Sequence, residues 1–182
     1  MKTRTKKLVV AALMLAIAVA SMFLKNTSVF ITGPIVNTCL MLTALFSGLV
    51  YGLILSVVTP LFSFLITGSP IMAAVPMIMP MIMIGNAILV FFTWLFASRI
   101  HKPNTEIIRI AIGGVVGAVV KAAFMWVTIS KWLLPAYLPE AMTKKLPILQ
   151  AQFSTTQLIT ALIGTALTMI IWPALRKARL TK

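Results

Sequence analysis

Residues 35–65 have the sequence IVNTCLMLTALFSGLVYGLILSVVTPLFSFL and contain no charged side chain. A helix needs about 20 apolar residues to cross the roughly 30 Å hydrocarbon core of a bilayer, so this run is too long for one crossing. Ser47 and Gly48 lie near its middle, where glycine weakens a continuous helix. We therefore predict two membrane-spanning helices joined by a tight turn at these residues; the alternative is one helix that fits the membrane badly.

The rest of the chain has the composition of a membrane protein. Of its 182 residues 60% are hydrophobic, the mean hydropathy is +1.07, and the two acidic residues are Glu106 and Glu140. Apolar runs of this length predict an all-α, polytopic membrane protein with six transmembrane helices in one bundle, forming a single integral membrane domain over residues 1–182. The predicted spans are 7–24, 34–46, 49–65, 81–98, 106–130 and 150–175.

Two connections stand out because they are rich in proline. Residues 67–80 contain three prolines and predict an irregular entry to the fourth span, which a membrane protein tolerates where protein or a water-filled cavity satisfies the backbone. Residues 131–149 contain three more and predict a long loop. The second span is expected to begin at Pro34, since proline suits the first turn of a helix.

The basic residues predict the orientation. The formal charge of +14 would suggest nucleic-acid binding in a water-soluble protein, but here Lys and Arg gather at the ends of the spans, where they meet lipid headgroups. With the N-terminus inside, eleven Lys and Arg lie on the cytoplasmic side and four outside. We expect a multi-pass protein of a bacterial or archaeal cell membrane, with both termini cytoplasmic and no nucleic-acid partner.

The first twenty residues also resemble a secretory signal, with a basic start, an apolar run and a small-x-small end at Ala18 and Ala20. We expect this segment to stay as an uncleaved first helix, because a polytopic chain uses the same pattern. Cys39 and His101 are each single, so neither an intramolecular disulfide nor a metal centre or other cofactor is expected.

Several polar residues within the apolar spans are candidate substrate ligands. The sharpest is Lys121, because a buried ammonium costs several kcal/mol unless it is paired or hydrated. It either reaches the outer interface along its stem or meets a solute. Asn37 and Asn86 hydrogen-bond either a neighbouring helix or a ligand, and Trp126 belongs either to the interfacial aromatic belt or to the site. In the sixth span a polar stripe recurs at i, i+4 and i+8: Gln152, Thr156 and Thr160.

Small residues at four-residue spacing predict close helix contacts. Ala12 and Ala16, continued by Ala20, line one face of the first helix. The pairs Gly48 with Gly52 and Gly113 with Gly117 repeat the pattern.

In this order, the motifs resemble those of the S-component, the substrate-binding membrane subunit of energy-coupling factor (ECF) vitamin transporters. The first helix has ALMLA at residues 12–16, the second opens with TGPIVN at residues 32–37, and the fourth has Pro80 followed by IGN at residues 84–86. The resemblance covers nearly the whole chain, and the Gly-Pro-x-x-Asn form is most similar to the branch that includes pantothenate and pyridoxine-type transporters.

This resemblance implies a subunit that captures a vitamin-like solute from outside and docks on a transmembrane coupling subunit driven by two ATPase subunits. Ala12 and Ala16 would be the docking residues, and the family's ligand site would map onto Asn86, Lys121, Trp126 and Gln152. Asn37, a polar residue of the second span, is the fifth predicted substrate ligand. The chain has no phosphate-binding Gly-x-x-x-x-Gly-Lys-Ser/Thr loop, so partners would hydrolyse ATP. An enzyme is not expected, whereas a membrane assembly protein without a solute stays open as the alternative.

Overall fold

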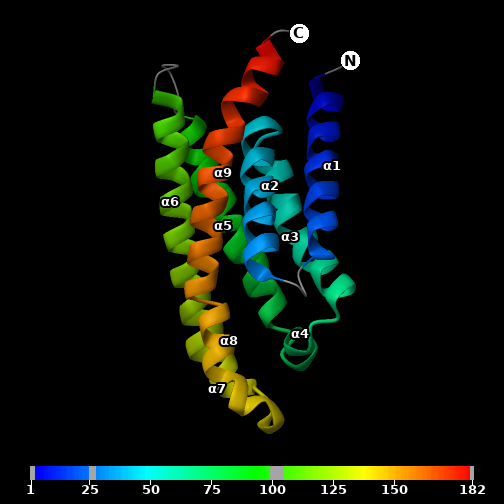
Figure 1. The fold of residues 1–182 in the computed structure, drawn as a ribbon, viewed down its shortest axis with the longest axis vertical. Coiled ribbons are helices and arrows are strands. Elements are labelled where there is room, and N and C mark those ends of the chain that lie inside the picture. The colour runs from blue at the N-terminus through cyan, green and yellow to red at the C-terminus, as the bar shows by residue number, and fades with distance from the viewer. Residues whose placement is uncertain (1–2, 25–27, 99–104, 181–182) are drawn as a thin grey trace.

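The computed structural model describes residues 3–24, 28–98 and 105–180, and within them every regular element is helical (Figure 1). Six helical spans are long and apolar enough to cross a membrane, which confirms the predicted fold class. The long helices are α1 (Thr3–Met22), α2 (Val29–Phe46), α3 (Leu49–Thr67), α5 (Ile78–Ser98), α6 (Glu106–Met125) and α9 (Thr155–Leu180). The short ones are α4 (Pro70–Ala74), the π-helix η2 (Trp126–Leu133), α7 (Leu134–Tyr137), the 3-10 helix η3 (Glu140–Lys145) and α8 (Leu146–Gln152).

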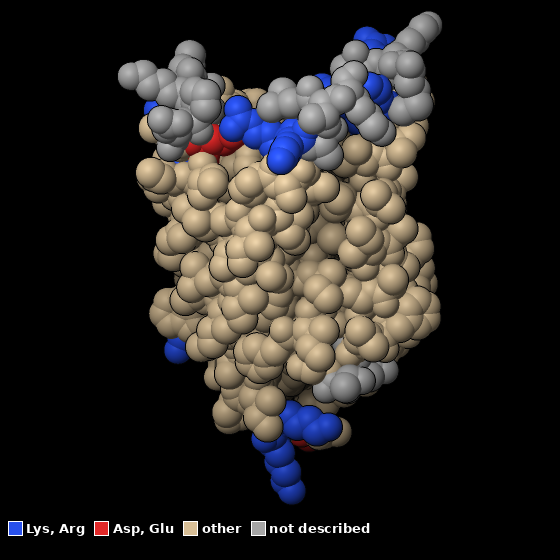
Figure 2. Space-filling model, turned by 45° about the horizontal axis from the view of Figure 1, so that its top comes forward, with Lys and Arg blue, Asp and Glu red and all other residues tan. Residues whose placement is uncertain are grey.

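The start of α1 and the end of α9 lie at one end of the bundle, here called the terminal end, and α4, α7 and α8 lie at the other, called the far end (Figure 1). On the face shown in Figure 2, Lys and Arg side chains gather at the terminal end, a few more lie towards the far end, and a broad belt without charge separates them. Glu106 at the start of α6 forms an ion pair with Arg176 of α9. This pattern is the one expected of a protein with a membrane around its middle.

The predicted helical hairpin is confirmed. Ser47 and Gly48 form the turn between α2 and α3, and Gly48 has φ = +98°, a conformation that residues with a side chain rarely adopt. The Ser47 hydroxyl donates a hydrogen bond of 2.8 Å to the Lys7 carbonyl of α1. The turn is therefore also held against the first helix.

The predicted start of α2 at Pro34 is wrong, because the helix begins at Val29 and Pro34 lies inside it. Ser28 caps this helix: its side chain accepts a hydrogen bond of 3.2 Å from the Phe30 N–H. A side-chain cap satisfies one of the unpaired N–H groups in the first turn of a helix. It therefore stabilises the beginning of α2 ahead of Pro34.

The predicted loop at residues 131–149 is also wrong, because this region is almost continuously helical. Its prolines begin short helices instead of breaking a long one: Pro135 and Pro147 lie in the first turns of α7 and α8, and Pro139 caps η3. Proline lacks an N–H, and the first turn is where that loss has no consequence for the helix.

Two side chains fasten the π-helix η2 to α8. The Gln150 side-chain amide donates to the Ser130 carbonyl at 2.9 Å, and the Ser130 hydroxyl donates to the Gln150 carbonyl at 3.0 Å. In a π-helical ladder the Ser130 carbonyl would pair with residue 135, which is a proline and has no N–H. Gln150 therefore supplies the donor that the backbone lacks.

The glycine pairs behave differently from one another. Gly113 and Gly117 bring α6 against the backbone of α5: a Cβ at Gly113 would lie 2.9 Å from the Phe92 carbonyl oxygen, and one at Gly117 would lie 3.1 Å from that of Leu89. Gly52 likewise contacts Val90. These three confirm the predicted close contacts, whereas Gly48 serves the turn, and a Cβ there would meet no atom within 4 Å.

We expect Gly113→Ala to lower the free energy of unfolding in detergent by roughly 1–3 kcal/mol, because the added methyl group meets backbone atoms of α5 that have little room to move. A decrease in the free energy of unfolding is informative, since alanine in place of glycine normally stabilises a helix by about 0.5–1 kcal/mol. Val115→Ala, at an exposed site of the same helix, is the control and should change stability little. Equal or greater stability of Gly113→Ala would show that the two helices are not in backbone contact.

Candidate functional site

A cavity of about 390 Å³ opens among the far-end halves of the helices. Its walls come from the end of α1, the first half of α2, the second half of α3, the irregular segment around α4, and from α5, α6, α8 and α9. The proline-broken segment 67–80 therefore borders a cavity, as irregular backbone at membrane depth requires. This volume lies at the small end of the range for ligand sites.

Lys121 is the centre of the polar wall. Its side chain is 2% exposed, and its Nζ donates hydrogen bonds of 2.8 Å to Asn37 Oδ1 and 2.9 Å to Asn86 Oδ1. Because an ammonium has donors and no acceptor, both amides must turn their oxygens towards it. The ammonium thus lies inside the bundle, joining α6 to α2 and α5, and its stem does not reach the membrane interface.

The sequence around this group lets the helices approach. Gly85 precedes Asn86 on α5, and a Cβ there would lie 3.1 Å from Met125 and 3.5 Å from the Lys121 side chain of α6. A larger residue at position 85 would press on the stem of Lys121. The Gly-Asn pair therefore combines room for the lysine with an acceptor for its ammonium.

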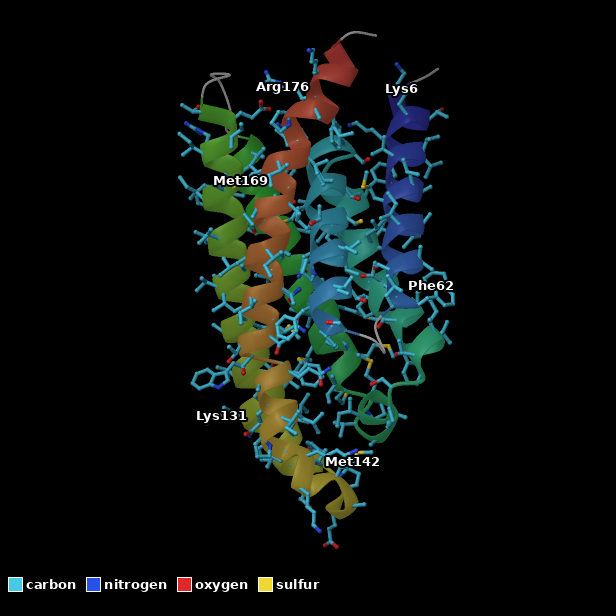
Figure 3. The ribbon with its side chains drawn as sticks, viewed as in Figure 1. Lys6, Phe62, Lys131, Met142, Met169 and Arg176 are labelled. Carbon is cyan, nitrogen blue, oxygen red and sulfur yellow. The ribbon has the colours of Figure 1, made fainter. Side chains whose placement is uncertain are left out.

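Gln152 also lines the cavity, so the structure brings four of the five predicted ligands together: Asn37, Asn86, Lys121 and Gln152. Trp126 lies outside this cavity. Its ring is 47% exposed, and the Lys131 Nζ lies 5.4 Å from the ring centroid. Lys131 points outward from the far end in Figure 3, as suits a residue pair at a membrane surface.

The expected polar stripe of the sixth span is wrong in its register. The chain is interrupted at residues 153–154, between α8 and α9, so Gln152 does not continue the face of α9. Gln157 lines the cavity in place of Thr156. Thr160 instead fills the space beside Gly33, where a Cβ would lie 2.8 Å from it, and its hydroxyl donates to the Thr156 carbonyl at 2.8 Å.

A row of polar residues on α3, Thr59, Ser63 and Thr67, also lines the cavity and was not among the predicted ligands. Their spacing of i, i+4 and i+8 in an otherwise apolar helix is the signal that could have found them. Thr59 donates to the Leu55 carbonyl at 2.8 Å, and Thr67 donates to the Ser63 carbonyl at 2.7 Å. Their hydroxyl oxygens keep lone pairs that can accept from a ligand.

Other candidate groups fall elsewhere. Within the described residues no three His, Cys, Asp or Glu side chains lie together as metal ligands. Cys39 is buried in the apolar core, and His101 lies outside the described residues. Ala12 and Ala16 are exposed on α1, which packs on the bundle through Ala11, Met14 and Ala18.

A double-mutant cycle tests the polar centre without a ligand. Asn86→Leu leaves the ammonium with one acceptor, so we expect the free energy of unfolding to fall by about 1.5–3 kcal/mol, the value of a hydrogen bond to a charged group. In a Lys121→Met background the same change should cost much less, because no ammonium is left unpaired. Gln152→Leu, another amide of the cavity with no hydrogen bond to Lys121, should be additive with Lys121→Met. If the effects of Asn86→Leu and Lys121→Met are additive, the hydrogen bond between these two side chains does not contribute to stability.

Comparison with known proteins gives one result. No curated protein and no solved structure matches the chain. The family model described as "ECF transporter, substrate-specific component" matches residues 6–178, which is nearly the whole chain and includes every helix that contributes to the cavity. The chain therefore belongs to the substrate-specific components of ECF transporters.

Proposed function

We propose that this chain captures a small, vitamin-like micronutrient from outside the cell in the cavity around Lys121 and delivers it to a coupling subunit for ATP-driven uptake. The family is one of transporter subunits and not of enzymes. The observation that carries the proposal is the polar centre: Lys121, Asn37 and Asn86 meet at a cavity of about 390 Å³. A few converging polar groups in a mainly apolar pocket are typical of a ligand site.

The cavity favours this function over that of an assembly protein without a solute. An assembly protein needs helix faces that pack closely against its partners. It gains nothing from a costly ammonium beside an internal cavity. The cavity also contains the side-chain amides of Gln152 and Gln157, which among the described residues have no hydrogen-bond partner. Such groups can satisfy a polar solute.

Thermal stabilisation in detergent by a panel of vitamins distinguishes these two functions. A solute that binds the folded protein raises its stability by RT ln(1 + [L]/Kd), or about 2.7 kcal/mol at one hundred times Kd. We expect one member of the panel to stabilise the protein and the others to have little effect. Stabilisation by none of them, together with no uptake by cells that express the chain with its coupling module, would favour the assembly function.

Docking is proposed to use the exposed alanine face of α1. Ala12, Ala16 and Ala20 are exposed and leave a shallow surface that another helix can approach closely. This face lies on α1, whereas the polar centre of the cavity lies on α2, α5 and α6. Capture and docking are therefore separable by mutation.

We expect the double variant Ala12→Trp with Ala16→Trp to abolish uptake and co-purification with the coupling subunit, because two indoles hold the partner helix away. The apparent Kd for the ligand, obtained from ligand-induced stabilisation, should stay within about twofold of the parent value, a change of roughly 0.4 kcal/mol. The control is Ala123→Trp with Ala166→Trp, which places the same indoles at exposed sites of α6 and α9. Transport at the parental rate by the first variant would show that the alanine face does not dock.

Orientation is proposed from the basic residues, with the terminal end in the cytoplasm. In a Cys39→Ala background, Lys144→Cys on η3 should react with a membrane-impermeant maleimide in intact cells. Lys6→Cys on α1 should react only after the membrane is permeabilised. Both positions are exposed. The reverse pattern of labelling would place the cavity on the cytoplasmic side and contradict capture from outside.

A further inference from the structure

We infer that the captured solute is an organic monoanion whose carboxylate lies against the Lys121 ammonium. This inference names the chemical class of the solute and rests on the proposed function. It follows from three features: the charge of the cavity, the direction of the hydrogen bonds at its polar centre, and the charges at the far end of the bundle.

The charge of the cavity is unbalanced. Of the described residues that line it, Lys121 is the one with a formal charge. The chain has two acidic residues, and neither is available: Glu106 pairs with Arg176 at the terminal end, and Glu140 is exposed on η3. A buried ammonium without a counter-ion is costly, and two amide oxygens supply dipoles but no negative charge.

The hydrogen-bond directions point to an acceptor. Both asparagine oxygens are turned to Nζ, which leaves the amide N–H groups of Asn37 and Asn86 without a partner among the described residues. The ammonium has three donors, and two of them are used. The polar centre therefore presents N–H groups from three helices, and a carboxylate offers two oxygens that accept several such bonds, which are stronger when the charges are opposite.

Other charge types fit less well. A cationic solute would meet the ammonium as a like charge at close range, which is unfavourable in a medium of low dielectric constant. A phosphate monoester carries a charge between −1.5 and −2 near neutral pH. It would exceed the single positive charge of the cavity. A neutral solute would leave the ammonium without a counter-ion.

The charges at the far end agree with this class. The far end carries exposed Lys131, Lys144 and Lys145 against Glu140, a balance of three positive and one negative charge among the described residues. Basic side chains are visible at that end in Figure 2. A positive surface at the far end, where the solute is proposed to enter, raises the local concentration of anions and speeds their approach.

The experiment identifies the bound solute and then tests its charge. Purified full-length protein in detergent is equilibrated with the small-molecule fraction of yeast extract, washed and denatured, and the released solutes are identified by mass spectrometry. A Lys121→Met sample is processed in parallel. We expect the parent to retain a solute with one carboxylate and no compensating cation, and Lys121→Met to retain at least about tenfold less of it, the factor for loss of one charged hydrogen bond.

The retained acid and its primary amide, which has nearly the same shape but no charge, are then titrated against both proteins. We expect the parent to bind the acid at least about tenfold more tightly than the amide, and Lys121→Met to bind the two within about twofold of each other. Lys121→Arg keeps a cation and should retain a preference for the acid. If Lys121→Met does not fold, the titrations of the parent and of Lys121→Arg with the acid and the amide show whether binding depends on the negative charge of the solute.

Two outcomes overturn different statements. A retained solute that is neutral or cationic, or an acid whose amide binds the parent equally well, contradicts the anion inference and leaves the capture function in place. If the parent protein retains no solute and no vitamin of the panel stabilises it, the proposed capture function is wrong. The anion inference then fails with it.

Discussion

The structure depends on one constraint: a lysine ammonium lies inside a bundle whose chain offers it no carboxylate. In hydrocarbon such a group must find other partners, and here two asparagine oxygens from separate helices meet it at 2.8 and 2.9 Å. The arrangement defines how α2, α5 and α6 are rotated about their axes. It also places the most polar point of the protein at the inner wall of its cavity, which links the stability of the bundle to the binding of a solute.

The far end shows how a membrane protein makes room for such a cavity. Irregular backbone is costly in a bilayer, yet α4 and the break at residues 153–154 interrupt the long helices there. Local hydrogen bonds compensate, as where Gly68 ends α3 in a left-handed conformation with its N–H on the Phe64 carbonyl at 2.8 Å, and where Gln150 supplies a donor to Ser130. Farther towards the terminal end, α5 and α6 pack closely at Gly113 and Gly117.

Membership in the family of ECF substrate-specific components gives these features a common context. The two surfaces proposed for function differ in chemistry. The proposed docking face is a strip of exposed alanine that offers only dispersion contacts, whereas the proposed capture site is a cavity with a polar centre that offers hydrogen bonds and a positive charge. Because the two proposed surfaces involve different residues, one can change in sequence while the other stays the same.

The sequence by itself determined the class of protein, the number of spans, the hairpin turn at Gly48 and the presence of an intramembrane cation without a counter-ion, because these follow from counts of apolar and charged residues along the chain. Tertiary structure decided which polar groups meet. The rotation of each helix and the break before α9 set whether Gln152, Thr156 or Trp126 faces the cavity. The physical reason is that hydropathy is a sum over neighbouring residues in the sequence, whereas a binding site depends on contacts between helices that are far apart in the sequence.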